Sequence, residues 1–417
     1  GPQGMAVIET VIDRIARFLK IDAATVRLRN FYTEKERNRT HYGQLVKHNR
    51  LPKIYSELIE SSSYFERRGE INSFNAKNEF IKRGLALTPV KFGISFTTSF
   101  LNQACALVNI YQDGSVNVNH GGTEMGQGLH TKIRQVAAEE LGVDLANINI
   151  TATNTSKVPN ASATAASSGT DLNGMAVKRA CEKLKSNLTE AFRIKFPESK
   201  GDLSFTNNHA QDGEFSFGFV DLVRFAYLNQ ISLSAVGFYK TPDIIYDREK
   251  GRGTPFHYFA YGMAVTEAEV DGLTGAHKLI RTDILHDVGD SINTLIDIGQ
   301  VEGAFVQGLG WVSSEEMKYD NKGNLLNHSP DTYKIPTITD IPIDFRVKLL
   351  KDSPNDLVIK KSKAVGEPPF MLALSAWLAL KDAVSAFGDH KQEPDFQMPA
   401  THEQIALSCD KLKRQIN

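Results

Sequence analysis

The chain has 417 residues, of which 41% are hydrophobic and 23% charged, proportions typical of a globular protein with two or three domains. Its 48 Lys and Arg residues nearly balance its 49 Asp and Glu residues, and the net charge of −1 argues against nucleic acid or an anionic membrane as a partner. The three cysteines (Cys105, Cys181, Cys409) are too few for the usual iron–sulfur cluster and form no disulfide framework, so we expect a cytoplasmic protein. No signal peptide is visible, and no apolar run approaches the length of a membrane span.

The first 85 residues have helical patterning. Apolar residues recur at helical spacing near the start of the chain and predict an amphipathic helix with a buried apolar face: Met5, Ile8, Ile12, Ile15 and Leu19. This helix follows position 1 with no initiator Met and no leader, which favours the downstream part of a longer protein. The alternative is that Gly1-Pro2 is left over from cloning.

Beyond residue 85 the pattern changes to hairpins and long helices. Three hairpins are predicted, turning at Asp113-Gly114, Asp271-Gly272 and Lys322-Gly323. Helices are predicted at 130–143 (closed by Gly142), 172–196, 297–317 and 371–387. The polar, turn-rich residues 197–216 predict a loop. Because regular βαβ alternation is missing, we expect an α+β fold, with one domain ending at residue 85 and a second over 86–417.

Small, glycine-rich stretches beside these elements are candidate binding loops. “HGGTEMGQGLHTK” (120–132) places Gly126, Gln127 and Gly128 before a helix, where free backbone N–H groups suit an anion such as phosphate. It is neither a dinucleotide-binding nor a Walker A motif. “NASATAASSGTDLNG” (160–174) offers little apolar area for a core, so it indicates either a close approach to a bulky ligand or a flexible Ser/Ala loop.

Two further stretches offer chemistry at named side chains. In “KFGISFTTSFLNQA” (91–104), Phe96 and Thr97 present a ring and a hydroxyl that suit a flat heterocycle, although Phe96 in an ordinary core is the commoner case. In “SKAVGEPPFML” (362–372), Glu367 stands between Gly366 and two prolines, which are expected to hold it extended and to aim its carboxylate. A surface turn is the alternative.

The sequence holds no common hydrolase motif. Its eleven histidines form no HxxxH or HExxH pair, and no GxSxG elbow is present. A catalytic Cys–His pair is an alternative, although no motif in the sequence indicates one.

Taken in order, these stretches resemble the C-terminal part of the molybdenum-binding region of the xanthine dehydrogenase family. The resemblance lies in “GPQGMAVIE”, “KFGISFT”, “GGTEMGQGLHTK”, “TAASSGTDLNG”, “GFYKTP”, “PFHYFAYG”, “DIGQVEGAFVQGLG”, “TYKIP” and “SKAVGEPP”. It spans nearly the whole chain and departs mainly around residues 182–216, where this sequence looks longer. In these terms, residues 1–85 are the remainder of the first molybdenum-cofactor-binding domain and 86–417 are the second.

The resemblance implies a molybdopterin cofactor and hydroxylation of a purine, hypoxanthine or xanthine, at a ring carbon with oxygen derived from water. Glu367 matches the base that takes the proton from Mo–OH, while hydride passes to the sulfido ligand. Phe96 and Thr97 match the substrate-contacting pair, and Ala165 lies against the substrate. Ala166 matches a position at the molybdenum. The remaining matches belong to the cofactor site: Gly126, Gln127, Ser167, Gln300 and Gly366.

The resemblance also implies that the chain works with other parts. The family's remaining active-site residues (a glutamate, two arginines, a phenylalanine and a glutamine) lie upstream of “GPQGM”. We therefore expect no turnover without an upstream segment or subunit, nor without [2Fe–2S] and FAD modules on partner chains, in an assembly that is dimeric. Two rival hypotheses are an aldehyde oxidase or other molybdenum hydroxylase of N-heterocycles, and a non-catalytic assembly fragment.

Overall fold

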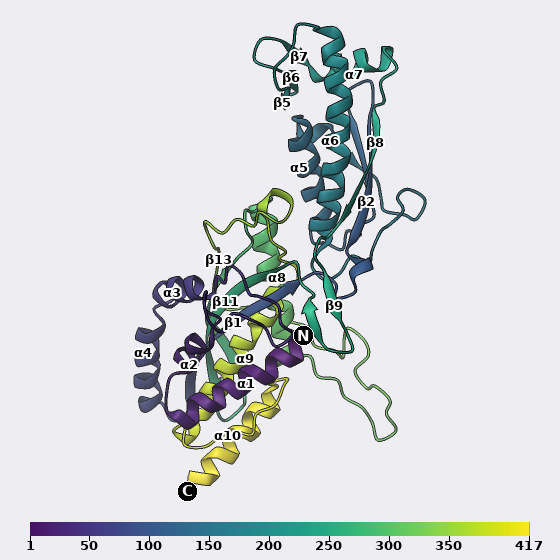
Figure 1. Cartoon of the computed structure of the whole chain (residues 1–417). Helices are drawn as coiled ribbons and strands as arrows, with labels where there is room; N and C mark the ends of the chain where they lie inside the picture. The colour runs from purple at the N-terminus through teal and green to yellow at the C-terminus, as the bar shows by residue number, and fades with distance from the viewer. Residues whose placement is uncertain (417) are drawn as a thin grey trace.

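Residues 1–416 are described by a computed structural model, in which they form a lower and an upper lobe (Figure 1). The lower lobe combines both ends of the chain, and the middle of the chain forms the upper lobe. The elements of the lower lobe are α1 (Pro2–Leu19), α2 (Ala23–Asn30), α3 (Leu51–Ser61), α4 (Tyr64–Lys77), β1 (Ile81–Ile94), β11 (Tyr258–Asp271), β12 (His277–His286), α8 (Thr294–Ser313), β13 (Asp344–Leu349), a 3₁₀-helix (Pro368–Ala373), α9 (Leu374–Ser385) and α10 (His402–Ile416). The predicted α+β fold is confirmed.

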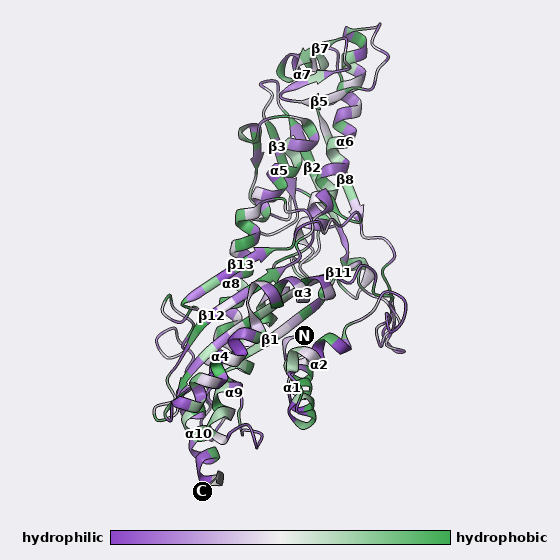
Figure 2. Ribbon diagram, turned by 90° about the vertical axis from the view of Figure 1, so that its left-hand side faces the viewer, coloured by the Kyte–Doolittle hydropathy of each residue, from purple (hydrophilic) through white to green (hydrophobic). Residues whose placement is uncertain are grey.

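A four-stranded sheet of order β1-β11-β12-β13 is the centre of the lower lobe. Both β1 and β12 pair antiparallel with β11, and β13 runs parallel to β12. Successive side chains of a strand point to opposite faces, so Leu85 and Leu87 pack with α3 and α4, while Ala86 belongs to the core around α9. Figure 2 shows hydrophobic residues along these strands. Helices thus cover both faces of the sheet.

The upper lobe has its own sheet, of order β4-β3-β2-β8. Its elements are β2 (Gln103–Ile110), β3 (Val116–His120), α5 (Leu129–Leu141), β4 (Ile148–Ile150), α6 (Gly169–Lys195), β5 (Ser204–Thr206), β6 (His209–Gln211), β7 (Ser216–Gly218), α7 (Phe219–Leu228) and β8 (Ser234–Lys240). Helices α5 and α6 share a core with the strands. At Gly237 a Cβ would lie 1.9 Å from the Ala176 carbonyl oxygen, so glycine permits the close packing of α6 on β8. Between the lobes, β9 (Ile245–Asp247) and β10 (Arg252–Thr254) form a separate ribbon.

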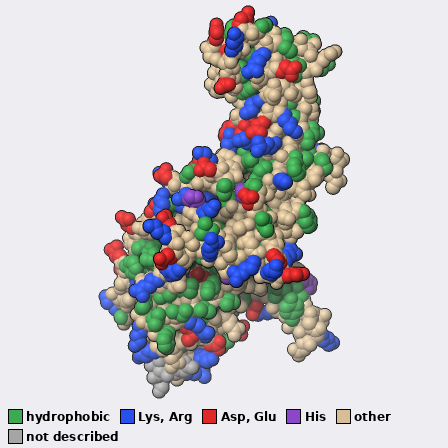
Figure 3. Space-filling model, in the orientation of Figure 1, with side chains coloured by type: hydrophobic (Ala, Val, Ile, Leu, Met, Phe, Trp, Pro, Cys, Tyr) green, Lys and Arg blue, Asp and Glu red, His purple; other side chains and the backbone are tan. Residues whose placement is uncertain are grey.

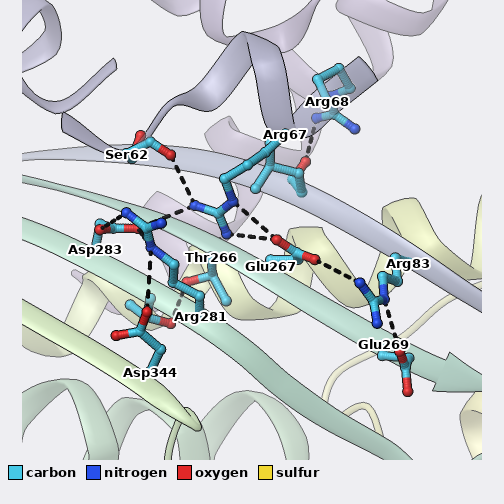
Figure 4. Close-up of polar contacts among 12 residues, drawn as sticks. Ser62, Arg67, Arg68, Arg83, Thr266, Glu267, Glu269, Arg281, Asp283 and Asp344 are labelled. Atoms are coloured by element: carbon cyan, nitrogen blue, oxygen red, sulfur yellow. Dashed lines mark hydrogen bonds and ion pairs between the residues drawn. The ribbon is translucent and has the colours of Figure 1, made fainter. Parts of the chain in front are cut away.

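A buried network of charges attaches α4 to the lower sheet (Figure 4). The Arg67 guanidinium lies 2.8 Å from Glu267 Oε2 on β11 and 3.2 Å from Asp283 Oδ2 on β12. Arg281 pairs with Asp283 at 2.7 Å, and Arg83 pairs with Glu269 at 2.8 Å. These groups lie on the face of the sheet that α3 and α4 cover, so the helices before β1 and the strands after it form one packed unit. The predicted boundary at residue 85 stays a prediction.

Most of the predicted elements are present. The first two hairpins form as β2–β3, with Gly114 at φ 83°, and as β11–β12. In place of the third predicted hairpin, residues 315–327 form a turn with an isolated bridge between Tyr319 and Leu325. All four predicted helices occur, with Gly142 closing α5 at φ 66°.

The loop predicted at 197–216 is wrong in part, because β5, β6 and β7 form a small sheet there. Asn207 and Asn208, at φ 49° and 59°, make the tight turn between β5 and β6, and Gly213 at φ 94° makes the next turn. Asparagine tolerates this left-handed backbone, and two such residues between short strands are a hairpin turn.

The prediction for α1 is right about the helix and wrong about its buried face. Glu9 and Ala16 are its buried residues, whereas three residues of the predicted stripe are exposed, Ile8 at 51%, Ile15 at 43% and Leu19 at 52%. Met5 and Ile12 are half-buried, and the neighbouring Phe18 is 86% exposed. Figure 3 shows hydrophobic side chains gathered over α1. The spacing of apolar residues shows which of them share a face, but not what covers it.

One helical stretch, Pro368–Gly388, is long and apolar enough to cross a membrane. The expectation that no apolar run approaches that length overlooked it. Its most apolar window is 89% buried within the lower lobe, as in the core helix of a globular protein.

Candidate functional site

A cavity of about 310 Å³ lies where the lobes meet. It is lined by residues 125–132 at the start of α5, 164–171 at the start of α6, 292–300 at the start of α8, and 362–367 before the 3₁₀-helix. The N-termini of three helices therefore surround it, and their dipoles favour a negatively charged group.

Glu367 lies at the mouth of this cavity and is exposed. Its Oε2 accepts a hydrogen bond of 2.5 Å from the Ser167 hydroxyl. The backbone N–H of Glu367 donates to Ser167 Oγ at 3.2 Å. Glu367 stands at φ −101° and ψ −39°, so the expected extended conformation is wrong. It is the N-cap of the 3₁₀-helix, where prolines at the first positions are well tolerated.

Gly366 lines the cavity beside Glu367. It is not among the glycines with positive φ, and apart from Gly366 itself and its two chain neighbours no atom of the described chain lies within 4 Å of where its Cβ would be. The position therefore leaves open space beside Glu367, where a larger residue would project.

The turn before α6 brings Ser167 to Glu367. Ala166 and Ser167 both adopt left-handed backbone, at φ 55° and 53°. This conformation costs non-glycine residues about 1–2 kcal/mol each, and consecutive examples are uncommon. Ala165 and Ser167 line the cavity, whereas Ala166 between them does not.

The loop before α5 supplies Gln127 to the cavity and satisfies its own amides. The Gln127 side chain accepts from the Met125 N–H at 2.5 Å and donates to the Thr123 carbonyl at 2.8 Å. The expected anion site on these amides is taken by the chain itself, because the Glu124 carboxylate accepts from the N–H groups of Gly126, Gly128 and His130 at 2.8–3.0 Å. Partial burial raises the pKa of Glu124, but these three bonds outweigh it and the net pKa is lowered. Gly126 does not line the cavity.

Buried charges form the inner wall of the cavity, and the sequence analysis did not single them out. Lys132 on α5 pairs with Asp297 on α8, which also accepts from the Ser291 hydroxyl at 2.5 Å. Asp171 on α6 accepts from the Tyr258 hydroxyl at 2.7 Å. Burial raises the pKa of Asp171 to about 7, although the bond from Tyr258 and the nearby Lys132 charge lower it. All three wall residues stand within stretches that the sequence offered for other reasons, but no local pattern marks them as neighbours.

Phe96 and Thr97 are not among the residues that line this cavity. They follow β1 and are half-buried. The side-chain amide of Asn102, itself buried, accepts from the Phe96 N–H and donates to the Phe96 carbonyl, both at 2.8 Å. The substrate role assigned to this pair stays a prediction.

The residues present fit an organic cofactor better than a metal held directly by side chains. Within residues 1–416, no group of three or more His, Cys, Asp or Glu residues is placed to hold a metal ion. Gln300 lines the cavity, and in the described part of the chain its amide has no side-chain hydrogen bond. Open space beside Gly366 and a free amide at Gln300 suit a polar group that enters between the lobes.

Comparison with known proteins identifies the family. The family model described as “Molybdopterin cofactor-binding domain” matches residues 57–342. The chain belongs to this molybdopterin cofactor-binding family. It is 49% identical to mouse xanthine dehydrogenase/oxidase and 45% identical to rice xanthine dehydrogenase, over 98% of its own length. It spans only about 30% of the length of these relatives.

Solved molybdenum enzymes share the fold. A Cu,Mo-CO dehydrogenase matches with a TM-score of 0.85 at 22% identity, over 99% of this chain and 52% of that one. Quinoline 2-oxidoreductase from Pseudomonas putida 86 matches with a TM-score of 0.85 at 23% identity, over 98% of this chain and 52% of that one. The predicted resemblance to xanthine dehydrogenase and the predicted molybdopterin cofactor are confirmed.

Proposed function

We propose that the chain is the C-terminal molybdopterin-binding part of a xanthine dehydrogenase-type hydroxylase that acts on a purine ring carbon, with Glu367 as the general base. The observation that carries this proposal is the contact between Ser167 and Glu367, which joins residues 200 positions apart at the mouth of the cavity. A surface turn has no need of such a partner.

When bound, the molybdenum cofactor supplies the two-electron oxidising centre of the reaction. Ser167 holds Oε2 of Glu367, and Oε1 has no partner in the described chain, so Oε1 is the oxygen available to accept a proton. A general base must lie within about 3 Å of the proton that it takes, and a fixed carboxylate meets this need better than a mobile one. Gln127, Gln300 and the open space beside Gly366 are assigned to the cofactor. Phe96, Thr97 and Ala165 are assigned to the substrate, and Ala166 to the side nearest the metal.

The exposed stripe of α1 supports the proposal that further protein completes the site. Large apolar side chains seldom stay exposed together unless another surface covers them. The relatives are also about three times as long as this chain. We assign the covering surface to an upstream molybdenum-binding segment or subunit, with iron–sulfur and FAD modules elsewhere in a dimeric assembly. Cys105, Cys181 and Cys409 are free and buried, which suits a cytoplasmic location.

The test is metal and pterin analysis of the assembled protein, followed by turnover of hypoxanthine, xanthine, an aldehyde and quinoline. We expect molybdenum and pterin, with the purines oxidised fastest and no turnover by the 417 residues alone. Faster oxidation of the aldehyde or quinoline would contradict the purine assignment. Absence of molybdenum from the assembled protein would favour a non-catalytic assembly role.

A further inference from the structure

The hydroxyl of Tyr258 joins three segments behind the cavity. Tyr258, the first residue of β11, donates to Asp171 Oδ2 at 2.7 Å and accepts from the Ala364 N–H at 2.8 Å. All three residues are buried, with Tyr258 7% exposed, Asp171 6% and Ala364 8%. A strand of the lower lobe thus holds the first turn of an upper-lobe helix and the segment that carries Glu367 (Figure 1).

The direction of these hydrogen bonds is set by chemistry. A backbone N–H can only donate, so the Tyr258 oxygen accepts from Ala364, and the hydroxyl proton is available to an unprotonated oxygen of Asp171. Consecutive bonds of this kind polarise and strengthen one another where water is excluded. The ring of Tyr258 packs with Ile94, Val358 and Ala364 in a small apolar cluster, which keeps the junction dry.

The same two segments meet a second time at the cavity mouth. Asp171 lies four residues after Ser167, and Ala364 lies three residues before Glu367. The contact between Ser167 and Glu367 is exposed, so it competes with water. The contact through Tyr258 is buried and does not. The buried contact is therefore the firmer of the two constraints on the spacing of Ser167 and Glu367.

We propose that Tyr258 is a positioning residue for the reaction, which holds the Glu367 segment against α6 and so sets where the Glu367 carboxylate lies. This inference rests on the proposed role of Glu367. Tyr258 does not line the cavity and acts through Ala364 and Asp171.

The test compares Tyr258→Phe with Tyr261→Phe in the assembled holoenzyme. Tyr261 lies on the same strand and is also buried, but its hydroxyl has no hydrogen-bond partner in the described chain. For Tyr258→Phe we expect unchanged molybdenum content, a KM within about threefold and a kcat lower by about 10- to 100-fold, because misplacement of a base costs rate rather than binding. Hydrogen exchange at the Ala364 amide should also speed up about tenfold or more, since its acceptor is lost. Tyr261→Phe should change neither quantity.

A second pair of variants covers the case in which Tyr258→Phe fails to fold. Asp171→Asn keeps an oxygen that can accept from Tyr258, whereas Asp171→Leu keeps none. The kcat of Asp171→Asn should therefore be at least about tenfold higher than the kcat of Asp171→Leu. Equal losses in this pair would overturn the proposal, as would normal kcat and normal exchange in Tyr258→Phe, or an equal loss in Tyr261→Phe. If the wild-type assembly held no molybdenum, the proposed function would fail, and Ala364 exchange would still test the contact.

Discussion

Ser167 holds one carboxylate oxygen of Glu367 at the mouth of the cavity, although 200 positions separate the two residues. The Gly-Glu-Pro-Pro pattern singled out Glu367, and the resemblance assigned its role, but neither revealed that Ser167 is its partner. The local argument also predicted an extended Glu367, whereas the residue begins a 3₁₀-helix. The steric rule for a residue before proline is a preference. Here Glu367 has helical backbone angles, and both its carboxylate and its backbone N–H bond to the Ser167 hydroxyl.

Removal of the Ser167 hydroxyl should weaken catalysis without loss of the fold. In Ser167→Ala, Oε2 of Glu367 loses its donor, and a hydrogen bond to a charged group contributes about 1.5–3 kcal/mol. We expect kcat to fall by about tenfold or more in steady-state assays, with unchanged molybdenum content. Ser162→Ala, in the same Ser/Ala-rich stretch but outside the cavity lining, is the control. Equal rates in the two variants would contradict a role for the contact.

Asp171 predicts a pH dependence of stability. Burial raises its pKa from 3.8 to about 7, so the folded chain holds this proton up to a higher pH than the unfolded chain. The stability that the raised pKa of Asp171 contributes is fully present below about pH 4 and is lost as the pH rises through 7. Asn cannot ionise, so the stability of Asp171→Asn relative to wild type should rise by roughly 2 kcal/mol between pH 5 and pH 8.5. Thermal unfolding at both pH values tests this, and a constant difference would contradict it.

Among the helices and strands, local sequence patterns predicted the features that depend on neighbouring residues, such as turns and helix ends. Asp-Gly turns located two hairpins, and Gly142 located the end of α5. Strands β5–β7 were missed because each has three residues, too few to show alternation, and because the Asn207-Asn208 turn was not recognised. The buried charges on α4 and the lower sheet were missed for a different reason. Ion pairs between Arg67 and residues 200 and 216 positions away leave no pattern along the chain.

Arg67 should be indispensable to the packing of α4. In Arg67→Leu, Glu267 and Asp283 lose a buried cation, and breaking such a pair typically costs about 3–5 kcal/mol. Denaturant unfolding of the assembled protein should show this loss. The control is Arg14→Leu, because Arg14 is 65% exposed and its pair with Glu393 is worth about 1 kcal/mol or less. Similar losses in the two variants would contradict the importance of the buried network.

At the scale of the whole molecule, the site belongs to neither lobe alone. Its lining comes from residues 125–132, 164–171, 292–300 and 362–367, which only the folded chain brings together. Six of the lining residues are ones that the family resemblance singled out, namely Gln127, Ala165, Ser167, Gln300, Gly366 and Glu367. Composition and periodicity could not show that these residues lie together, because such patterns describe only neighbours within one helix or strand. The same limit applies to α1, because the sequence shows which apolar residues share a face of the helix but not whether other residues of the chain cover that face.

The exposed face of α1 should matter to assembly and not to the fold of this chain. Phe18 is 86% exposed, so Phe18→Asp breaks no packing within the described residues. If another part of the enzyme covers α1, a buried aspartate at that interface should lower the yield of assembled, molybdenum-loaded protein by about tenfold or more. Size-exclusion chromatography with metal analysis measures this. Leu228→Asp on α7, where Leu228 is 78% exposed, should have no effect, and neither should Phe18→Asp if α1 faces solvent.

Glu367→Gln tests the proposed role of Glu367 as the proton acceptor, in the assembled enzyme with matched molybdenum content. The amide keeps the shape of the side chain and its contact with Ser167 but cannot take a proton, so kcat for xanthine should fall by about 10²–10⁴-fold or more with unchanged thermal stability. Glu66→Gln, an exposed change on α4, should keep the wild-type rate. Turnover of Glu367→Gln at the rate of Glu66→Gln would contradict the assignment of Glu367 as the general base.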